Sequence, residues 1–484
     1  MPAFAVRATI PWTVAFLEGF STLAVEVIAI RLAIPVVGSS VVLTGVMLGI
    51  VLFALSAGYW RGGELSAKWD AARTRKILAR NLLLAAALYG VIAFPFEARL
   101  LDRLLDWLNL PLSIGITAAA LYLAPIYFAS QTVPMLAEVT SGDGHAGRAS
   151  GKVLFFSTLG SVIGGVFTPV YLFPWLGVAR SSYLVCAVLA AAAGMMMASR
   201  AEVVRTLVLG SAAVAAAVSV HAMTSPSGDL FSFDSAYQTI RIVDEKAPNG
   251  RIERVLRMGG GGASGVFADT GRTSFAYTLA AERLLRESDA TNALVIGSAG
   301  FTFPRDVAKF PAIARVDAVD VDPSVKPIAE RHFLNAPLPP NVRFLPLSAR
   351  FAVRKLAREQ QHYEFTFVDT YFGKGIPDEL VTSEFFRDVH AISDRTVVNA
   401  VVDRDLQSAF ARNLLASFRD AFHGVWLVDG RPDEESFLTN MLVLSWPAPG
   451  SQPWNGDGKA YRDDRNNADR DRVALMWADQ GSGN

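Results

Sequence analysis

Long apolar runs dominate the first half of the chain. Seven of them lie near residues 11–34, 39–59, 80–96, 112–134, 153–176, 181–198 and 203–221. Most approach the ~20 residues that a helix needs to cross ~30 Å of hydrocarbon. The pattern predicts an α-helical transmembrane bundle of about seven spans over residues 1–222.

After residue 223 the pattern changes to short strand-like runs that alternate with helix-like segments. Two of these runs, Tyr237–Asp244 and Ile252–Met258, predict a small β unit. The later runs lie at residues 292–297, 315–321, 341–346, 364–369, 395–402, 424–428 and 441–445. This alternation predicts an α/β domain with a parallel, doubly wound sheet over residues 223–448. Residues 449–484 are polar, and we expect a partly disordered tail there.

Charge and cysteine content narrow the class of protein. Residues 1–222 carry 15 of the 45 basic and 10 of the 45 acidic side chains, and the second half carries the rest. The balance excludes a strongly basic nucleic-acid binder and a wholly disordered chain. The single cysteine, Cys186, and six scattered histidines predict no disulfide framework and no metal site.

Basic residues between the apolar runs predict the orientation. Eleven Lys and Arg fall on the side that includes the 60–80 segment, against four on the other side. The N-terminus is therefore expected in the cytoplasm, in an integral protein of a bacterial inner membrane. Seven spans would place the second half outside, but one miscounted span reverses this, so its side stays open.

Two acids lie inside the first apolar run. Glu18 and Glu26 share one face of a helix with Ser21 and Thr22. Carboxylates are costly in lipid, so they should face the bundle interior or a wet cavity. They indicate either a site for a cationic amine or an internal ion pair, with Arg31 or another helix, that fixes packing.

Glycines mark close contacts and turns. Residues 45–49 and 160–164 have glycines four apart, which favours helix packing. Residues 258–265 are dense in glycine, and we expect a flexible loop, either a lid over a site or a mobile hairpin loop.

A glycine turn follows the first strand of the predicted sheet. Gly297 and Gly300 bound this turn, and Asp320 ends the next strand 23 residues after Gly297. In such sheets, ligands bind at the carboxyl ends of the strands. A glycine there admits a ligand to the backbone, and an acid at this spacing can accept hydrogen bonds from a ribose diol.

With these residues assembled, the second half resembles the spermidine synthases, Rossmann-like transferases related to class I methyltransferases. The whole chain resembles the membrane-fused branch of that family. The resemblance covers about residues 230–446 and rests on residues 235–238, 272–277, 294–297, 319–322, 368–371 and 376–386, plus a pattern in residues 17–32.

The resemblance implies residue roles. For the donor it implies Gln238 near the nucleotide, Asp320 on the ribose, and contributions from Gly297, Gly300 and Ser348. For the acceptor it implies Asp369 as the acid that helps deprotonate the attacking amine, with Tyr371 and Tyr277 completing the pocket. From the residue alone, Asp369 can also be read as a strand-end cap.

Several of the family's acids are missing. The family's Gly-Gly-Gly-Asp turn is Gly297–Gly300 without its acid, an Asp-Glu pair is Thr273-Ser274, and the acid expected near the adenine is Ser348. The departures weaken decarboxylated S-adenosylmethionine plus putrescine as the substrate pair.

The implied function is a membrane-embedded transferase. It would move an aminopropyl or related group from S-adenosylmethionine, or its decarboxylated form, to an amine, a polyamine or an amine-bearing lipid. Membrane lipids are expected partners, nucleic acid is not, and a homodimer is left open. Two alternatives remain: a transporter or sensor that binds a nucleotide or amine without catalysis, and an S-adenosylmethionine-dependent methyltransferase.

Overall fold

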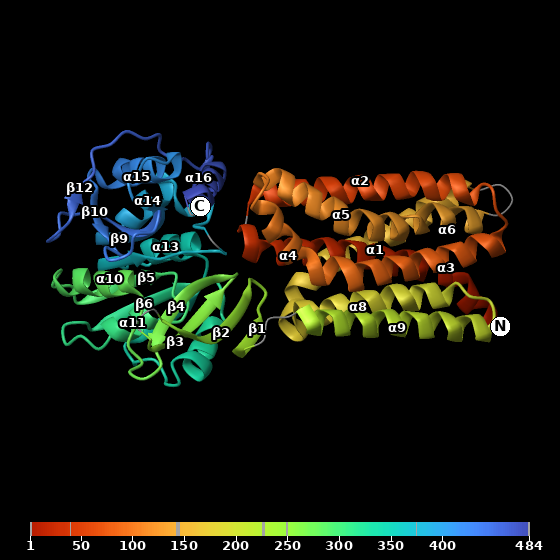
Figure 1. Ribbon diagram of the computed structural model, residues 1–484, viewed down its shortest axis with the longest axis horizontal. Helices are drawn as coiled ribbons and strands as arrows, with labels where there is room; N and C mark the ends of the chain where they lie inside the picture. Colours follow the sequence, from red (N-terminus) through yellow and green to blue (C-terminus); the bar gives the residue numbers. More distant parts are fainter. Residues whose placement is uncertain are drawn as a thin grey trace. The chain divides into compact units, whose positions relative to one another are not determined.

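The chain folds into two compact units, Met1–Ser227 and Gly228–Asn484 (Figure 1). The computed structural model describes residues 2–38, 40–141, 146–224, 228–247, 250–373 and 375–482.

The first unit is entirely helical in its described residues (Figure 1). Side-chain caps fix several helix starts: Ser40, Asp70 and Asn109 each accept a hydrogen bond from the backbone N–H three residues on. The helices are α1 Pro2–Val37, α2 Val41–Ser66, α3 Ala71–Ala87, α4 Phe94–Leu105, α5 Leu110–Ser130, α6 Thr132–Ser141, α7 Ala146–Phe167, α8 Phe173–Met195 and α9 Arg200–Thr224, with π-helical turns η1 Leu88–Ala93 and η2 Thr168–Leu172.

Six helical ranges of the described residues are long and apolar enough to cross a membrane, against about seven expected. They are Thr9–Val37, Val41–Ser66, Ala71–Leu105, Leu110–Ser141, Gly147–Met195 and Arg200–Thr224. The difference arises at Gly147–Met195, which joins two of the predicted runs. That range contains Gly177, whose φ of 78° and ψ of 170° are not helical.

Glycines set the closest helix contact in this unit. A Cβ on Gly160 or Gly164 of α7 would lie 2.0 or 2.3 Å from the carbonyl oxygens of Phe16 and Phe20 on α1. The predicted packing role of residues 160–164 is therefore confirmed. For residues 45–49 the prediction was wrong within the described part of the chain, where no atom lies within 4 Å of a Cβ built on Gly45 or Gly49.

The contacts also give the relative directions of the helices. Gly160 meets Phe16 and Gly164 meets Phe20, so α1 and α7 run parallel. By the same reasoning α2 runs parallel to α5, because Val46 meets Gly115 and Gly58 meets Ser130. Helices α8 and α9 run antiparallel, because Gly194 meets Leu207 while Gly210 meets Ala190.

The second unit begins with a four-stranded antiparallel sheet, in the order β1 Asp229–Asp234, β2 Thr239–Lys246, β3 Ile252–Met258 and β4 Gly261–Phe267. This sheet corrects the flexible loop expected over residues 258–265. Only Gly259 and Gly260 form the turn, at φ values of 55° and 86°, and residues 261–267 pair with β3 as a strand.

The main sheet has eight strands in the order β12-β10-β11-β9-β8-β5-β6-β7. The strands β5 Asn292–Ile296, β6 Arg315–Asp320, β7 Val342–Pro346, β8 Tyr363–Val368 and β9 Ser393–Asp403 are parallel, which confirms the α/β prediction. The last strands, β10 Trp426–Asp429, β11 Leu438–Leu444 and β12 Gln452–Pro453, are antiparallel.

Helices flank this sheet, and two apolar clusters form the core on its faces (Figure 1). The helices of this unit are α10 Ala276–Arg286, α11 Thr302–Val307, α12 Val325–Ile328, α13 Ala349–Arg358, α14 Ser383–His390, α15 Ala409–Phe422 and α16 Ala468–Ser482, with the short turns η3 Ala329–Phe333 and η4 Asp378–Leu380.

The segment expected as a partly disordered tail is largely folded. Helix α16 occupies much of it, and Tyr461, Arg472 and Leu475 are buried. The Tyr461 N–H donates to Ser417 Oγ at 2.7 Å, and Arg472 donates to the Ile376 carbonyl at 2.6 Å. Composition alone gave the wrong expectation of disorder. Most of the segment is polar or charged, but a few of its apolar side chains and one arginine are buried and tie it to the fold.

Candidate active site

The parallel strands bring the predicted site residues to one edge of the main sheet. Ile296 pairs with Val319 on one side and with Val368 on the other, so Gly297, Asp320 and Asp369 follow neighbouring strand ends. The chain order reverses at β5, which has β6 and β8 as its neighbours. Such a switch point is where open α/β sheets bind ligands.

The turn after β5 is organised by Asp320. Its Oδ2 accepts hydrogen bonds from the N–H groups of Ser298 and Ala299, at 3.2 and 3.1 Å. Its Oδ1 accepts a third from the Asp322 N–H at 3.0 Å. A carboxylate has about four acceptor sites, so roughly one remains for a ligand hydroxyl. Burial raises the pKa of Asp320, while these backbone donors oppose the rise.

Glycine is required at both predicted positions of this turn. Gly297 has a φ of 91°, and a Cβ there would lie 2.0 Å from the carbonyl oxygen of Asp369. A Cβ on Gly300 would lie 2.6 Å from the Phe333 ring and 2.7 Å from Ser264 Cβ. Gly300 also donates its N–H to Ser264 Oγ of β4, at 3.1 Å, which links the turn to the small sheet.

Asp369 lies at the centre of a small polar network. Tyr277 donates its hydroxyl to Asp369 Oδ2 at 3.1 Å, and Asn399 donates its amide to Oδ1 at 2.7 Å. Loss of solvation raises the pKa of Asp369 from 3.8 to about 6, against the opposing effect of these two donors. A carboxyl group with that pKa is ionised at neutral pH and can still take up a proton, as a general base must.

Two asparagines of this network were missed in the sequence. Asn399 is 1% exposed on β9, and its Oδ1 accepts from the amide of Asn440 on β11 at 3.0 Å. Because Asn440 donates to the oxygen of Asn399, the nitrogen of Asn399 must face Asp369. A signal existed, since Asn399 interrupts an otherwise apolar strand.

Tyr371 has its hydroxyl engaged with β9. The hydroxyl donates to the Asn399 carbonyl at 3.2 Å and accepts from the Val401 N–H at 2.8 Å. Strand β8 pairs with β9 only as far as Val398. Beyond that residue, the Tyr371 hydroxyl forms the hydrogen bonds to the β9 backbone that a neighbouring strand would otherwise form. Burial and the Asp369 carboxylate raise the pKa of Tyr371, so its hydroxyl stays protonated.

Gln238 is buried beside the loop that follows β8. Its side-chain oxygen lies 3.2 Å from a Cβ built on Gly259, and the same Cβ position is 2.9 Å from Gly373 Cα. Within the described residues this oxygen, Oε1, has no hydrogen-bond partner. A buried acceptor without a donor suits a ligand that supplies one.

Ser348 is the predicted site residue that the structure connects least. It follows β7 at the same edge, is exposed, and makes no side-chain cap to helix α13. None of the hydrogen bonds found among the described residues joins its side chain to Asp320 or Asp369.

In the first unit, Glu18 is buried and already bonded. Its carboxylate accepts from Ser157 of α7 at 3.0 Å and from Thr22 at 3.2 Å. Glu26 is 7% exposed, and no hydrogen bond or ion pair reaches it among the described residues. The structure therefore does not join the two acids in one site.

A third buried acid of this unit, Glu97, was missed in the sequence. Glu97 accepts a hydrogen bond from Tyr122, and both side chains are 1% exposed. Nearby, Tyr89 donates its hydroxyl to Ser182 at 3.1 Å. Glu97 lies one residue beyond the predicted apolar run 80–96, so the run did not include it.

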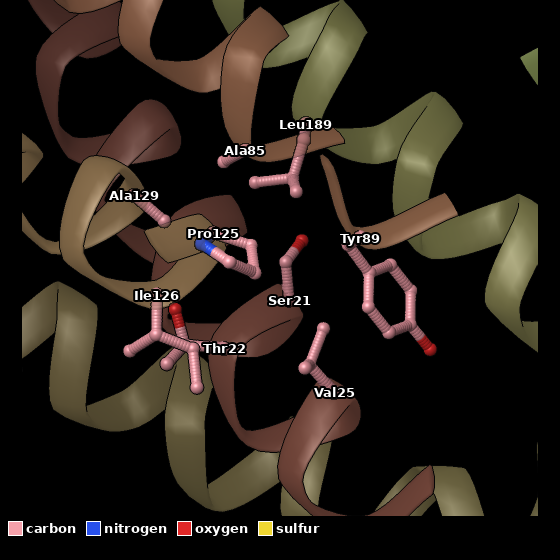
Figure 2. A pocket seen from close by; sticks show the side chains of 9 residues that line it. All are labelled: Ser21, Thr22, Val25, Ala85, Tyr89, Pro125, Ile126, Ala129 and Leu189. Atoms are coloured by element: carbon pink, nitrogen blue, oxygen red, sulfur yellow. The ribbon is translucent and has the colours of Figure 1, made fainter. Parts of the chain in front are cut away.

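A small cavity lies beside Ser21 and Thr22 (Figure 2). The cavity volume is about 10 Å³, close to what a single water molecule needs, and Figure 2 shows Pro125, Leu189 and Tyr89 around the Ser21 side chain. Thr22 donates its hydroxyl to Glu18, and Ser21 donates to the Leu17 carbonyl. With these polar groups engaged, the lining is mainly apolar.

Comparison with known proteins finds one clear relative by sequence. No protein-family model matches the chain. A polyamine aminopropyltransferase from Vibrio vulnificus is 35% identical over 92 residues, which are 19% of this chain and 30% of that protein. Over those 92 residues the chain is a sequence homologue of this aminopropyltransferase. The match spans less than a third of that relative's length.

The solved structures with some likeness include spermidine synthases and a methyltransferase-like protein. A probable spermidine synthase from Corynebacterium glutamicum is 19% identical with a TM-score of 0.36, over 46% of this chain and 80% of that chain. Spermidine synthase from Thermotoga maritima is 17% identical with a TM-score of 0.36, over 49% and 82%. Human methyltransferase-like protein 13, solved with SAH, is 18% identical with a TM-score of 0.30, over 43% and 90%.

Proposed function

We propose that the protein is a membrane-embedded transferase that moves an aminopropyl or related group from an adenosyl sulfonium donor to an amine. The observation that carries this proposal is Asp369, held by Tyr277 and Asn399 beside the Gly297 turn. The sequence relationship to a polyamine aminopropyltransferase supports the same chemistry.

The reaction needs one base and one bond exchange. An ammonium acceptor binds to the Asp369 carboxylate and gives it a proton, which frees the nitrogen lone pair. The lone pair attacks the carbon next to the sulfonium, forming a C–N bond. The C–S bond breaks, its electron pair stays on sulfur, and a neutral thioether leaves with a secondary ammonium product.

The donor site would be formed at the turn after β5. Gly297 and Gly300 leave room at the backbone, Asp320 has roughly one acceptor site for a ribose hydroxyl, and Gln238 offers its unpartnered oxygen. S-adenosylmethionine and its decarboxylated form both carry the required sulfonium. Ser348 would contribute to donor binding only because it follows β7 at the same edge of the main sheet.

The first unit would cross the membrane seven times. A straight helix over the 49 residues of Gly147–Met195 would be roughly 73 Å long, far more than ~30 Å of hydrocarbon. The contact pattern makes α7 parallel to α1, and the backbone breaks at Gly177 before α8. Splitting this range there gives seven passes, with the N-terminus and the second unit on opposite sides.

The excess of basic loop residues then favours a cytoplasmic N-terminus, as in a bacterial inner-membrane protein. Of the two intramembrane acids, Glu26 is the better candidate for meeting an amine substrate, because Glu18 is already bonded to Ser157. Membrane lipids would surround this unit.

One observation favours a second function. Thr273 and Ser274 stand where the family has two acids, and both hydroxyls form hydrogen bonds within the protein. Thr273 donates to the Gly265 carbonyl, and Ser274 donates to Glu253. A site without those acids suits a sensor or transporter that binds a nucleotide or amine without turnover. A methyltransferase would use the same sheet.

The products distinguish these functions. Methylthioadenosine from the purified protein, donor and amines would support transfer of the aminopropyl or aminocarboxypropyl arm, and S-adenosylhomocysteine would support methyl transfer. Binding without either product would support a sensor or transporter.

A further inference from the structure

The segment that follows the candidate base has little hydrogen-bonded structure of its own. Residues 375–379 come a few positions after Asp369, and the Phe372 N–H donates to the Gly375 carbonyl at 2.8 Å. The regular structure that follows is the three-residue turn η4 Asp378–Leu380. The shape of this segment must therefore come from contacts with other parts of the unit.

Arg472 of α16 is buried against the segment. Its Nη1 donates to the Ile376 carbonyl at 2.6 Å, and a Cβ on Gly375 would lie 2.6 Å from its Nε. The Arg472 side chain is 8% exposed, and its Nη2 donates to Asp469 Oδ1 at 2.9 Å. Because a buried charge is stable only when it is paired, Asp469 keeps the guanidinium in the place from which it reaches the Ile376 carbonyl.

Two further carbonyls of the segment are held in a similar way. Asn466 donates its amide to the Asp378 carbonyl at 2.7 Å. Arg350 donates its Nε to the Glu379 carbonyl at 2.8 Å, while its two Nη atoms donate to the Asp463 carboxylate at 2.6 and 2.5 Å. Side chains that belong to residues 463–472, or pair with them, thus bind the carbonyls of Ile376, Asp378 and Glu379.

A second anchor lies just before the segment. Gly373 Cα lies 2.9 Å from the Cβ position of Gly259, in the turn between β3 and β4. The Asp369 carboxylate has separate partners, since Tyr277 and Asn399 donate to it. Loosening the segment would therefore change the border of the site and leave the base in place.

We propose that Arg472 is a positioning residue for amine binding. Through the Ile376 carbonyl it keeps residues 375–379 in the conformation that admits the acceptor beside Asp369. The inference rests on the proposed function. Without Arg472 a smaller fraction of molecules is competent to bind the amine, and apparent affinity falls in proportion to that fraction. The chemical step, which depends on Asp369 and its own partners, stays the same.

The first test is steady-state kinetics of full-length Arg472→Met. The donor is S-adenosylmethionine or its decarboxylated form, and the amines are putrescine, spermidine, butylamine and phosphatidylethanolamine in nanodiscs. For the amine that the native protein uses best, KM should rise roughly tenfold. The kcat value, the donor affinity and the acidic limb of the pH profile should stay as in the native protein. Arg472→Lys, which keeps the charge and a donor, should have a smaller effect.

A second variant avoids the buried ion pair. Asn466→Asp keeps the side-chain size and removes the donor to the Asp378 carbonyl, so it should raise the amine KM in the same direction. Arg419→Met is the matched control. Arg419 donates to the Gly456 carbonyl at 2.9 Å, so it ties a nearby part of the chain to α15 rather than to the segment. Its removal should lower the melting temperature and leave the amine KM unchanged.

Hydrogen exchange tests the same contact without turnover. The N–H groups of Phe372 and Leu380 donate to the Gly375 and Pro377 carbonyls, each at 2.8 Å. In Arg472→Met these two amides should exchange roughly tenfold faster, while the amides of β9 stay as in the native protein.

An unchanged amine KM in both Arg472→Met and Asn466→Asp would overturn this inference, as would a fall in kcat at constant KM or unchanged exchange at the two amides. If the native protein forms no nucleoside product, the proposed function fails instead, and the exchange measurement still decides whether Arg472 holds the segment.

Discussion

The amide of Asn399 donates a 2.7 Å hydrogen bond to Oδ1 of Asp369, and this contact favours the ionised form of the candidate base. Burial raises the pKa of Asp369 to about 6, and the Asn399 donor holds it below the value that burial alone would give. This hydrogen bond links the end of β8 to the middle of β9, and local sequence patterns do not predict which residues of two strands meet.

The pH dependence of turnover should follow this carboxyl group. The base must be ionised, so activity should fall as pH drops through about 6. Asn399→Ala removes a donor that stabilises the ionised form, so the acidic limb of the profile should move to higher pH. The profile of kcat/KM against pH measures both.

The matched control is Asn413→Ala, since Asn413 also donates to a carboxylate, Asp471, at 3.0 Å but lies outside this site. An unchanged acidic limb in Asn399→Ala, with activity retained, would contradict Asp369 as the base.

Gly297→Ala should abolish turnover and destabilise the second unit. A positive φ alone costs a residue with a side chain about 1–3 kcal/mol, and here the new Cβ would also lie 2.0 Å from the Asp369 carbonyl oxygen. Gly450→Ala is the control, because Gly450 has a φ of 76° but nothing within 4 Å of a Cβ. Equal melting temperatures and activities for the two variants would contradict the close approach at Gly297.

Tyr371→Phe should act mainly on stability. It leaves the Asn399 carbonyl and the Val401 N–H without their partner, at a cost of about 1–3 kcal/mol. Chemical denaturation measures this loss. If stability stays unchanged while kcat falls strongly, the hydroxyl acts on the substrate rather than on β9.

Seven membrane passes predict a labelling pattern. In a Cys186→Ala background, Trp107→Cys and Asp457→Cys should react with an impermeant thiol reagent from one side of the membrane, and Lys68→Cys from the other. Each of these positions is exposed. Labelling of Lys68→Cys and Asp457→Cys from the same side would indicate an even number of passes.

Periodicity predicted the elements well, because apolar runs and strand-helix alternation are local signals. The helical first half, the parallel strands and the positions of Gly297, Asp320 and Asp369 at strand ends all follow from such signals. The number of membrane spans is harder to assign than the helices themselves, because helical hydrogen bonding continues across the break at Gly177 and joins two apolar runs into one range.

The partners within the site could not be predicted, because they depend on pairing between distant strands. Asn399 and Asn440 meet only through the β9–β11 register, and Tyr277, which bonds Asp369, packs against Gly430 after β10. Glycine content misled at residues 261–267, where the backbone pairs with β3 regardless of side chains.

The most direct test of the central claim is mass spectrometry of the nucleoside product. The purified protein is incubated with S-adenosylmethionine or its decarboxylated form and an amine panel, beside an Asp369→Asn variant that keeps the side-chain size but cannot act as a base. The account predicts methylthioadenosine from the native protein and none from the variant, at equal melting temperatures. Equal amounts of methylthioadenosine from both proteins, or no product with the donor still bound, would contradict it.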